Sequence, residues 1–443
     1  MKHYESWGRY PKAEHSVFSV GWRHQEVPFP RFSEGVLPFG LGRSYGDVCL
    51  NDQGTLLHTQ DLRHLISFDS ESGVLECEAG ISLQEIIEIF LPKGWFPPVV
   101  PGTKFVTVGG AIANDIHGKN HHRAGTFGCH VQGFELLRSS GERIFCSPQK
   151  NTELFEATIG GLGLTGLILW ARIQLKKMRT PWLDVEHLPF VNLHGFLSLC
   201  QDSDSKYEYT VAWLDCVSGN AKAGRGIFIR GNPSDSQKTS MPMGESQGSF
   251  KMPVDAPPFL LNRHTMGLMN EAYFRLQSRK KDTVLMGYEP FFFPLDKVHD
   301  WNRFYGRAGF LQYQFVLPEG AESVLQEIFD KIVRSGLGSF LAVLKRFGDK
   351  VSPGLLSFPM KGLTLALDFP IHGTAVFELL SSLDELVARA GGAVYPAKDA
   401  RMSAQNFRLF FPKWEAFSRT IDPKFSSDFW KRVAAQKVVA GGQ

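Results

Sequence analysis

Residues 101–128, PGTKFVTVGGAIANDIHGKNHHRAGTFG, are the stretch that decides the fold of this chain. They combine closely spaced glycines with hydroxyl and amide side chains and with three histidines, His117, His121 and His122. We expect a loop-like segment that is neither a core strand nor a core helix. Glycines at this density let backbone N–H groups approach a ligand closely, and a phosphate benefits most from such contacts.

Two further glycine-rich pieces flank this stretch, GLGRSYGD at residues 40–47 and GGLGLTG at residues 160–166. The P-loop pattern GxxxxGK[ST] is absent from the sequence. GLGLTG at 161–166 fits GxGxxG, but it lies between an expected helix and an expected strand, which is the wrong context for a Rossmann site. Any one cluster could be tight turns alone. Three together favour a large phosphate-bearing cofactor held by several loops.

The composition is that of an ordinary globular protein. The 443 residues suggest two or three structural units, with 43% hydrophobic and 21% charged residues. A net charge of +3 gives no reason to expect a nucleic-acid partner. The six cysteines are widely spaced, which argues against a metal site and for free thiols. The 36 phenylalanines suit either a large core or an apolar substrate groove.

The N-terminal residues lack the apolar region of a signal peptide, and no stretch approaches the ~18 apolar residues of a membrane span. We therefore expect a cytoplasmic protein, or one peripheral at a membrane surface.

The N-terminal half alternates short strands and helices. Ser82 and Glu85 form a capping-box pattern at the start of a helix over residues 82–90. The other expected elements are strands at 56–57, 74–79 and 167–175, a hairpin over 133–146 and a helix at 152–157.

The C-terminal half predicts a different layout. Residues 218–256 are rich in Gly, Ser, Pro, Met and Lys, which indicates a long surface loop that acts either as a lid or as an insertion without a role. Strands at 312–317, 341–347 and 363–369 alternate with helices at 321–334 and 375–390. This alternation predicts an antiparallel sheet backed by helices on one side.

The order of the motifs resembles a known fold. GLGRSYGD, PGT…VTVGGAIA, DIHGKNHH and ATIGGLGLTG follow one another as in the vanillyl-alcohol-oxidase-type, or PCMH-type, flavoproteins. Within that fold the chain is similar to the flavin-dependent oxidase subunits of decaprenylphosphoryl-β-D-ribose 2′-epimerase. DIHGKNHH is quite specific to that subgroup, and DWNR (300–303), GFLQYQF (309–315), LSFP (356–359) and YPAKDAR (395–401) resemble its C-terminal segments. The resemblance is weakest in residues 1–30 and 218–260.

The resemblance implies an α+β, two-domain PCMH-type FAD-binding fold. Residues 1–181 would form the FAD-binding domain, completed by 393–443, and residues 182–392 a substrate domain with a mobile loop at about 218–260. Residues 38–48 and 107–110 would offer backbone N–H groups to the pyrophosphate of FAD. The implied cofactor-binding residues are Pro38, Gly40, Gly42, Arg43, Ser44, Tyr45, Gly46, Asp47, Gly102, Thr107, Val108, Gly109, Gly110, Asn114, Asp115, Ile116, His117 and Tyr395.

Many members of the wider fold tether the flavin to a histidine in the first loop. The corresponding position here is Arg43, which cannot form that bond. We therefore expect FAD to be held non-covalently.

The resemblance also places the reacting groups. Lys398, His117 and Tyr45 are the expected catalytic residues, and Gln314, Lys345, Lys398 and Ala366 are expected to contact the substrate. By composition alone Lys398 would be a surface lysine and His117 a structural loop histidine. Gln312 and Gln314 share an expected strand and are assigned to opposite faces, with Gln314 toward the flavin.

Two other features of the site are open or specific to this chain. His121, His122 and Lys119 form either a cationic patch or a solvated loop. Mycobacterial members of the similar family look to have a cysteine at the position of Ala366 in this chain. Inhibitors that react covalently with that thiol should therefore not label this protein.

The implied reaction is oxidation of a secondary sugar hydroxyl, the 2′-hydroxyl of a polyprenylphosphoryl ribose, to a ketone. A short-chain dehydrogenase/reductase partner would then complete the epimerisation, and the lipid-linked sugar substrate would bring the chain to a membrane surface. One alternative is an alditol or sugar-lactone oxidase of the D-arabinono-1,4-lactone type. Another is a non-catalytic flavin-binding scaffold for the reductase.

Overall fold

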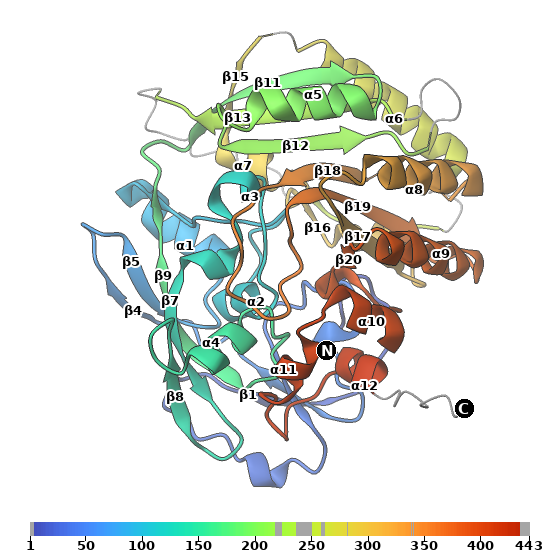
Figure 1. The fold of residues 1–443 in the computed structure, drawn as a ribbon. Coiled ribbons are helices and arrows are strands. Elements are labelled where there is room, and N and C mark those ends of the chain that lie inside the picture. The colour runs from blue at the N-terminus through green and yellow to red at the C-terminus, as the bar shows by residue number, and fades with distance from the viewer. Residues whose placement is uncertain are drawn as a thin grey trace.

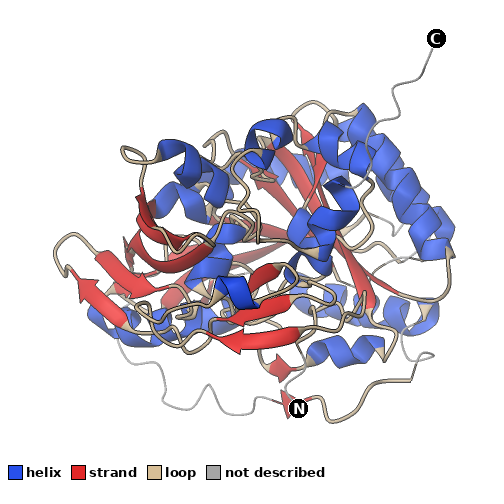
Figure 2. Ribbon diagram, turned by 90° about the horizontal axis from the view of Figure 1, so that it is seen from below, coloured by secondary structure: helices blue, strands red, loops and turns tan. Residues whose placement is uncertain are grey.

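The computed structural model describes residues 4–217, 224–235, 250–257, 262–280, 282–337, 339 and 341–434. Two bodies of β-structure lie against each other, the lower one built mainly from N-terminal elements and the upper one around a large sheet (Figure 1). The view from below shows helices on one side of the strands, while strands also reach the outer edge of the molecule (Figure 2). The fold is therefore the mixed α+β architecture that the sequence predicts.

The lower body contains a parallel three-stranded sheet in the order β1-β3-β2 and an antiparallel sheet in the order β4-β5-β9-β7-β8. The strands of these sheets are β1 (Ser16–Ser19), β2 (Val36–Phe39), β3 (Thr55–His58), β4 (Leu65–Phe68), β5 (Val74–Glu78), β7 (Val131–Leu137), β8 (Arg143–Cys146) and β9 (Leu167–Gln174). Its helices are α1 (Leu83–Phe90), α2 (Val108–Ala113), α3 (His121–Ala124) and α4 (Thr152–Thr158), and β6 (Trp95–Phe96) pairs with β10 (Lys176–Lys177).

The capping box predicted for α1 is confirmed. Ser82 Oγ accepts a hydrogen bond from Glu85 N at 3.1 Å, and Ser82 N donates to Glu85 Oε2 at 2.9 Å. These bonds satisfy two backbone N–H groups that a helix start leaves unpaired. The predicted hairpin over 133–146 is confirmed as well, as β7 and β8.

The upper body is an eight-stranded sheet in the order β15-β11-β13-β12-β18-β19-β17-β20, in which every pairing is antiparallel. Its strands are β11 (Trp182–Phe190), β12 (Tyr209–Leu214), β13 (Gly226–Pro233), β15 (Val284–Gly287), β17 (Phe310–Pro318), β18 (Ala342–Phe347), β19 (Gly362–Pro370) and β20 (Ala393–Val394). A separate pair joins β14 (Phe250–Lys251) to β16 (Val298–His299). The helices of this body are α5 (Leu193–Ser203), α6 (Arg263–Ser278), α7 (Tyr288–Phe292), α8 (Glu322–Ser335) and α9 (Ala375–Arg389).

Helices α5, α8 and α9 cover one face of the large sheet. Phe196 of α5 packs on Phe228 of β13, and Tyr313 of β17 donates a hydrogen bond to Asp384 of α9 at 2.9 Å. This agrees with the prediction of a sheet backed by helices. Helix α6 lies on the opposite face, because the residues of β12 and β13 that point away from α5 line a cavity together with α6.

Two expectations about local structure are wrong. Residues 226–233 form strand β13 between β11 and β12 rather than part of a surface loop. The apolar run at its start was hidden by the polar composition of the wider stretch, and most of the predicted loop lies outside the described residues. Residues 101–128 also include buried helical turns, since α2 buries Val108, Ala111 and Ile112.

The C-terminal helices α10 (Ala404–Phe410), α11 (Trp414–Ser418) and α12 (Asp428–Ala434) return to the lower body. Arg432 of α12 pairs with Asp47 at 2.8 Å, and Val36 of β2 bridges Phe425. These contacts are compatible with a C-terminal segment that completes the N-terminal unit, and the exact domain limits stay a prediction. Among the described residues, no helix combines the length and the apolar character that a membrane crossing requires.

Candidate active site

A cavity of about 1010 Å³ lies between the lower body and the inner face of the large sheet. Its walls include the loops at 40–45 and 100–119, strands β12, β13, β17, β18 and β19, and the segment that follows β20. Small-molecule and cofactor sites typically occupy about 300–1,000 Å³. The volume is therefore large enough for a cofactor together with a substrate.

The first glycine-rich loop presents free amides to this cavity. The backbone N–H groups of residues 40–44 donate to no other atom of the described residues, and all five residues line the cavity. Residues 40–44 are half-buried, so these N–H groups are accessible to an acceptor bound in the cavity. A pyrophosphate is an acceptor of the right kind.

The second loop contributes less than expected. The N–H groups of Val108 and Gly109 donate at 2.8 Å to the carbonyls of Ile81 and Ala79, and that of Gly110 donates to Thr107 Oγ1 at 3.1 Å. Three of the four amides assigned to the pyrophosphate are therefore already used in this structure. The reason is that α2 begins here, and its first turn is hydrogen-bonded to residues 79–81, which follow β5, and to its own N-cap Thr107.

Most of the predicted cofactor-binding residues line the cavity. These are Pro38, Gly40, Gly42, Arg43, Ser44, Tyr45, Gly102, Thr107, Gly109, Gly110, Asn114, Ile116, His117 and Tyr395. Several carry buried polar atoms without a hydrogen-bond partner among the described residues, namely Arg43 Nε, Asn114 Oδ1 and His117 Nδ1. Such atoms cost free energy unless a ligand satisfies them. Arg43 Nε and a protonated His117 Nδ1 are donors that fit a phosphate-bearing group, whereas Asn114 Oδ1 is an acceptor that a donor group of the ligand would satisfy.

Four predicted residues do not line the cavity, and their role at the cofactor stays a prediction. Asp47 pairs with Arg432, and Val108 is fully buried in α2. Asp115 accepts hydrogen bonds from Ser352 and Ser357, each at 2.5 Å. Gly46 is required by a close approach, because a Cβ there would lie 1.7 Å from the backbone oxygen of Asp399.

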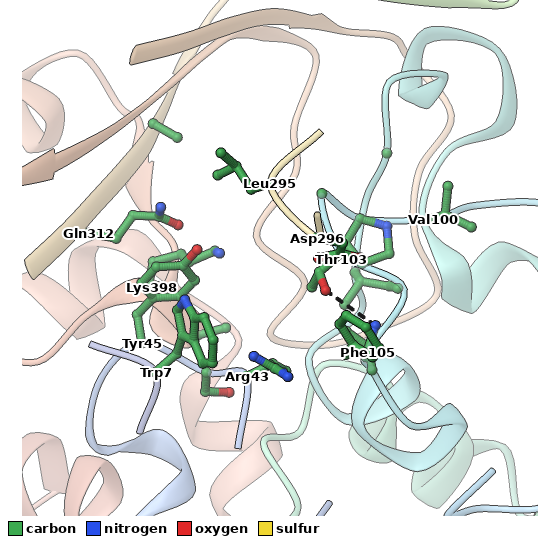
Figure 3. Close-up of a pocket in the computed structure, with 18 of the residues that line it drawn as sticks. Trp7, Arg43, Tyr45, Val100, Thr103, Phe105, Leu295, Asp296, Gln312 and Lys398 are labelled. Atoms are coloured by element: carbon green, nitrogen blue, oxygen red, sulfur yellow. Dashed lines mark hydrogen bonds between the residues drawn. The ribbon is translucent and has the colours of Figure 1, made fainter. Parts of the chain in front are cut away.

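Lys398, which sequence reasoning could place only by resemblance, projects into the cavity next to Tyr45 (Figure 3). Its Nζ lies 3.7 Å from the centroid of the Tyr45 ring. The ring face attracts a cation and also shields it from water. The 3-10 turn Pro396–Lys398, directly after β20, holds the side chain in this position.

Asp368, which the sequence did not reveal, does not line the cavity but acts on two residues that do, Gln312 and Lys398. It is buried on β19 and accepts hydrogen bonds from Gln312 Nε2 at 2.5 Å and from Tyr305 Oη at 3.2 Å. The only sign in the sequence was that an acidic residue stands within the apolar stretch 363–369, where a buried strand is expected. The register of β19 against β17, which places Asp368 opposite Gln312, could not be obtained from the sequence.

Burial shifts the protonation of this cluster. It lowers the pKa of Lys398 to about 7, although the charge of Asp368 acts in the opposite direction. Burial likewise lowers the pKa of Lys345 to about 8 and raises that of Asp368 to about 6. A lysine with such a pKa exists partly as the neutral amine near pH 7, which can accept a proton.

His117 and Gln314 both line the cavity and are hydrogen-bonded to each other. Gln314 Nε2 lies 2.9 Å from His117 Nε2, so the amide donates to an imidazole whose proton is on Nδ1. Burial, followed by the charge of Lys345, lowers the pKa of His117 well below its usual value. His117 is therefore neutral at pH 7, and its Nδ1 has no hydrogen-bond partner among the described residues.

The assignment of Gln312 and Gln314 to opposite faces is wrong. Both line the cavity, while Tyr313 between them points toward α9. The physical reason is that residues two apart on a strand share a face. Ala366 pairs with Gln314 and Lys345 with Thr364, so these predicted substrate residues lie on the same cavity-facing surface of the sheet.

The histidines that follow His117 do not form a cationic patch or a solvated loop. His121 is buried, and its pKa falls to about 3 because of burial. Burial also lowers the pKa of His122, whose Nε2 lies 3.0 Å from the Tyr207 carbonyl. Lys119 lines the cavity instead, where its Nζ donates to the Phe291 and Phe292 carbonyls.

Comparison with known proteins narrows this geometry to a family. A family model described as an FAD binding domain matches residues 30–147. Decaprenylphosphoryl-beta-D-ribose oxidase of Mycolicibacterium smegmatis is 39% identical over 413 residues, which is 90% of this chain and 89% of that protein. The chain belongs to the PCMH-type FAD-binding family. It is an FAD-binding oxidoreductase, and FAD is its cofactor.

Two other relatives show how the similarity is distributed within this FAD-binding family. An uncharacterized protein of Streptomyces coelicolor is 33% identical over 371 residues, covering 80% of this chain and all of that protein. Cytokinin dehydrogenase 8 of Oryza sativa is 27% identical over 208 residues, 44% of this chain and 39% of that enzyme. Of these three relatives, the mycobacterial and streptomycete proteins match most of this chain, whereas the rice enzyme matches less than half of it.

Proposed function

We propose that this flavoprotein oxidises a secondary hydroxyl of a sugar, the 2′-hydroxyl of a polyprenylphosphoryl ribose, to the 2′-keto form. The observation that carries the proposal is the buried amine of Lys398 beside Tyr45 and Asp368, in the wall of the cavity that also contains the free amides of residues 40–44. The substrate class is suggested by the name of the mycobacterial relative.

Each side chain has a defined task in this proposal. Bound FAD would supply the two-electron acceptor for the hydride leaving the carbinol carbon. Lys398, as the neutral amine, takes the hydroxyl proton, and the Tyr45 ring then shields the resulting ammonium. His117 Nδ1–H and the Lys345 side chain hold the sugar oxygens, with Gln314 fixing the imidazole. Proton and hydride thus leave the substrate on separate paths, and a ketone remains.

The direct test is anaerobic reduction of the bound flavin with a panel of sugars. The panel contains a prenylphosphoryl ribose, an alditol and an aldonolactone, and the readout is flavin bleaching with identification of the product. We expect rapid bleaching by the prenylphosphoryl ribose, with a 2′-ketone as product. Faster bleaching by the alditol or the lactone would favour the related oxidase activity. Bleaching by none of them would favour a flavin-binding scaffold without turnover.

We propose further that FAD is held without a covalent bond. At the position where many relatives tether the flavin, the guanidinium of Arg43 lies 4.0 Å from the Trp7 ring centroid and 5.3 Å from that of Phe105 (Figure 3). A side chain stacked in this way offers no nucleophile to the flavin. Acid precipitation should therefore release the yellow colour into the supernatant. Colour that stays in the pellet would contradict this.

The proton-accepting role of Lys398 predicts a pH dependence. Because the pKa of Lys398 is about 7, the neutral fraction and the rate of flavin reduction should rise with pH through about 7 and level off above it. Asp368 favours the charged amine, whereas Lys345 opposes it. Asp368→Asn should thus move the midpoint to lower pH. The measurement is the rate of flavin reduction between pH 5 and 9 (about two units either side of that pKa), and an unmoved midpoint would exclude this coupling.

We also propose that a short-chain reductase receives the ketone and that the protein works at a membrane surface. Both follow from the chemistry of the product and of the lipid-linked sugar. Reduction of a 2′-ketone from the opposite face requires a separate hydride donor. Co-purification of a nicotinamide-dependent reductase, and conversion of the ketone only in its presence, would test the pairing.

A further inference from the structure

The cavity does not end at Lys398 and His117. It extends along the inner face of the large sheet into an apolar arm whose walls come from neighbouring strands. Val211 and Trp213 of β12, Ile229 of β13 and Met286 of β15 line this arm. Val211 and Trp213 are two apart on their strand and therefore share its cavity-facing side. A small polar sugar alone would gain no favourable contacts from this apolar lining.

Helix α6 forms the roof of the apolar arm. Met269, Tyr273 and Gln277 line the cavity at i, i+4 spacing, so they form one stripe along the helix. The Tyr273 ring lies 4.9 Å from that of Trp213, which closes the arm from above. The helix covers the cavity-facing side of the sheet and not the side that carries α5.

Polar contacts fix the roof in place. Asn270 Nδ2 donates to Asp215 Oδ1 at 2.9 Å, and Arg225 Nη2 donates to Glu271 Oε2 at 2.8 Å. Asp215 and Arg225 belong to the chain around β12 and β13 and are themselves buried. The arm is therefore a preformed feature between two anchored elements.

The apolar arm opens to solvent at Met269. This side chain lines the cavity and is also 52% exposed, so it marks the mouth of the arm. Its neighbour Leu268 is 74% exposed but does not line the cavity. Lys280 and His187 also lie along the arm, and burial lowers the pKa of His187 to about 4, which leaves it neutral.

We propose that the apolar arm binds the first isoprene units of a prenyl chain and that the chain leaves the protein beneath α6, past Met269. This inference rests on the proposed lipid-linked substrate, and it states where the lipid part of that substrate binds. Transfer of a hydrocarbon chain from water into the apolar arm is favourable by roughly 25 cal/mol per Å² of apolar surface buried. A free alditol or lactone would leave the arm without an occupant of matching chemistry.

The test uses prenyl phosphates of one to three isoprene units as probes, without turnover. Their binding to the FAD-loaded protein is measured by titration calorimetry. We expect the dissociation constant to fall at least about tenfold from one unit to three, since each buried CH₂ contributes up to about 0.8 kcal/mol. Met269→Ser and Tyr273→Ser should abolish most of this gain while leaving the one-unit probe unchanged. Leu268→Ser, one residue away on the same helix, is the matched control and should behave like the wild type.

The outcomes separate this inference from the proposed reaction. Equal affinities for all three probes, or equal effects of the Met269 and Leu268 substitutions, would overturn the apolar arm as a prenyl site. A retained chain-length dependence in a protein whose flavin no sugar reduces would leave the prenyl site standing and remove the proposed oxidation. Because the calorimetric readout needs no catalysis, the two failures cannot be confused.

Discussion

Replacement of Lys398 by methionine should lower the rate of flavin reduction by substrate by about 10²–10⁴-fold, the usual contribution of one positioned acid–base group. The substitution keeps the length and apolar stem of the side chain but removes the group that accepts the hydroxyl proton. The FAD content should not change, because the free amides that hold the anion lie in residues 40–44 and not at Lys398. Stopped-flow reduction of the purified holoprotein measures the effect.

Lys361→Met serves as the control for that experiment. Lys361 is an exposed lysine whose Nζ pairs with Glu319 at 2.7 Å on the protein surface, so its loss should leave the rate unchanged. A Lys398→Met protein that keeps its flavin and reduces it at the wild-type rate would remove Lys398 from the reaction. The proton would then have to leave to another group in the cavity, such as the amine of Lys345, whose pKa is lowered to about 8 by burial.

Arg432→Leu is the second substitution with a large expected effect. Arg432 forms charge-assisted hydrogen bonds to both oxygens of Asp47, at 2.8 and 2.9 Å, and one to Asp399 at 2.9 Å. Both carboxylates are buried, so removal of the guanidinium leaves two unpaired charges inside the protein. We expect a loss of about 3–5 kcal/mol in the free energy of unfolding. Denaturant unfolding of the holoprotein measures this loss.

The same substitution should also weaken FAD binding, because Asp47 directly follows the glycine-rich loop at 40–46 and Asp399 follows Lys398. Arg419→Leu is the matched control, since Arg419 is exposed on the same C-terminal segment. It should change the unfolding free energy by less than about 0.5 kcal/mol. Equal stabilities of the two variants would show that the pairing with Asp47 and Asp399 is not what joins the C-terminal segment to the cofactor loop.

Several parts of the fold follow from local patterns. The capping box at Ser82 fixes the start of α1, and the alternation of apolar strands and amphipathic helices between 310 and 390 gives β17, β18, β19, α8 and α9 close to their observed limits. Such features depend on neighbours three or four residues apart, which a sequence displays directly. Strand β13 was missed because its apolar start is short and lies within a polar stretch.

The candidate site likewise has one part that the sequence predicts and another that only the structure shows. The glycine-rich loops predict a phosphate-bearing ligand, and their resemblance to a flavoprotein family supplies Lys398, His117, Gln314 and Lys345. Neither route predicts Asp368, because its partners Tyr305, Gln312 and Lys398 are brought to it by the register of β19 and by the turn after β20. Contacts between residues so far apart in the sequence depend on how the chain packs and not on local propensity.

The sequence by itself determined that this chain presents glycine-rich backbone to a large anion, and that a strand-and-helix domain follows. Glycine density and hydrophobic periodicity are local properties, so they can be established without coordinates. Only the tertiary structure decided which amides remain free, that the amine of Lys398 is buried beside Tyr45 with a pKa near 7, and that α6 roofs an apolar arm of the cavity. The physical reason is that hydrogen-bond satisfaction, desolvation and cavity shape arise from atoms that lie far apart in the chain and meet only when it folds.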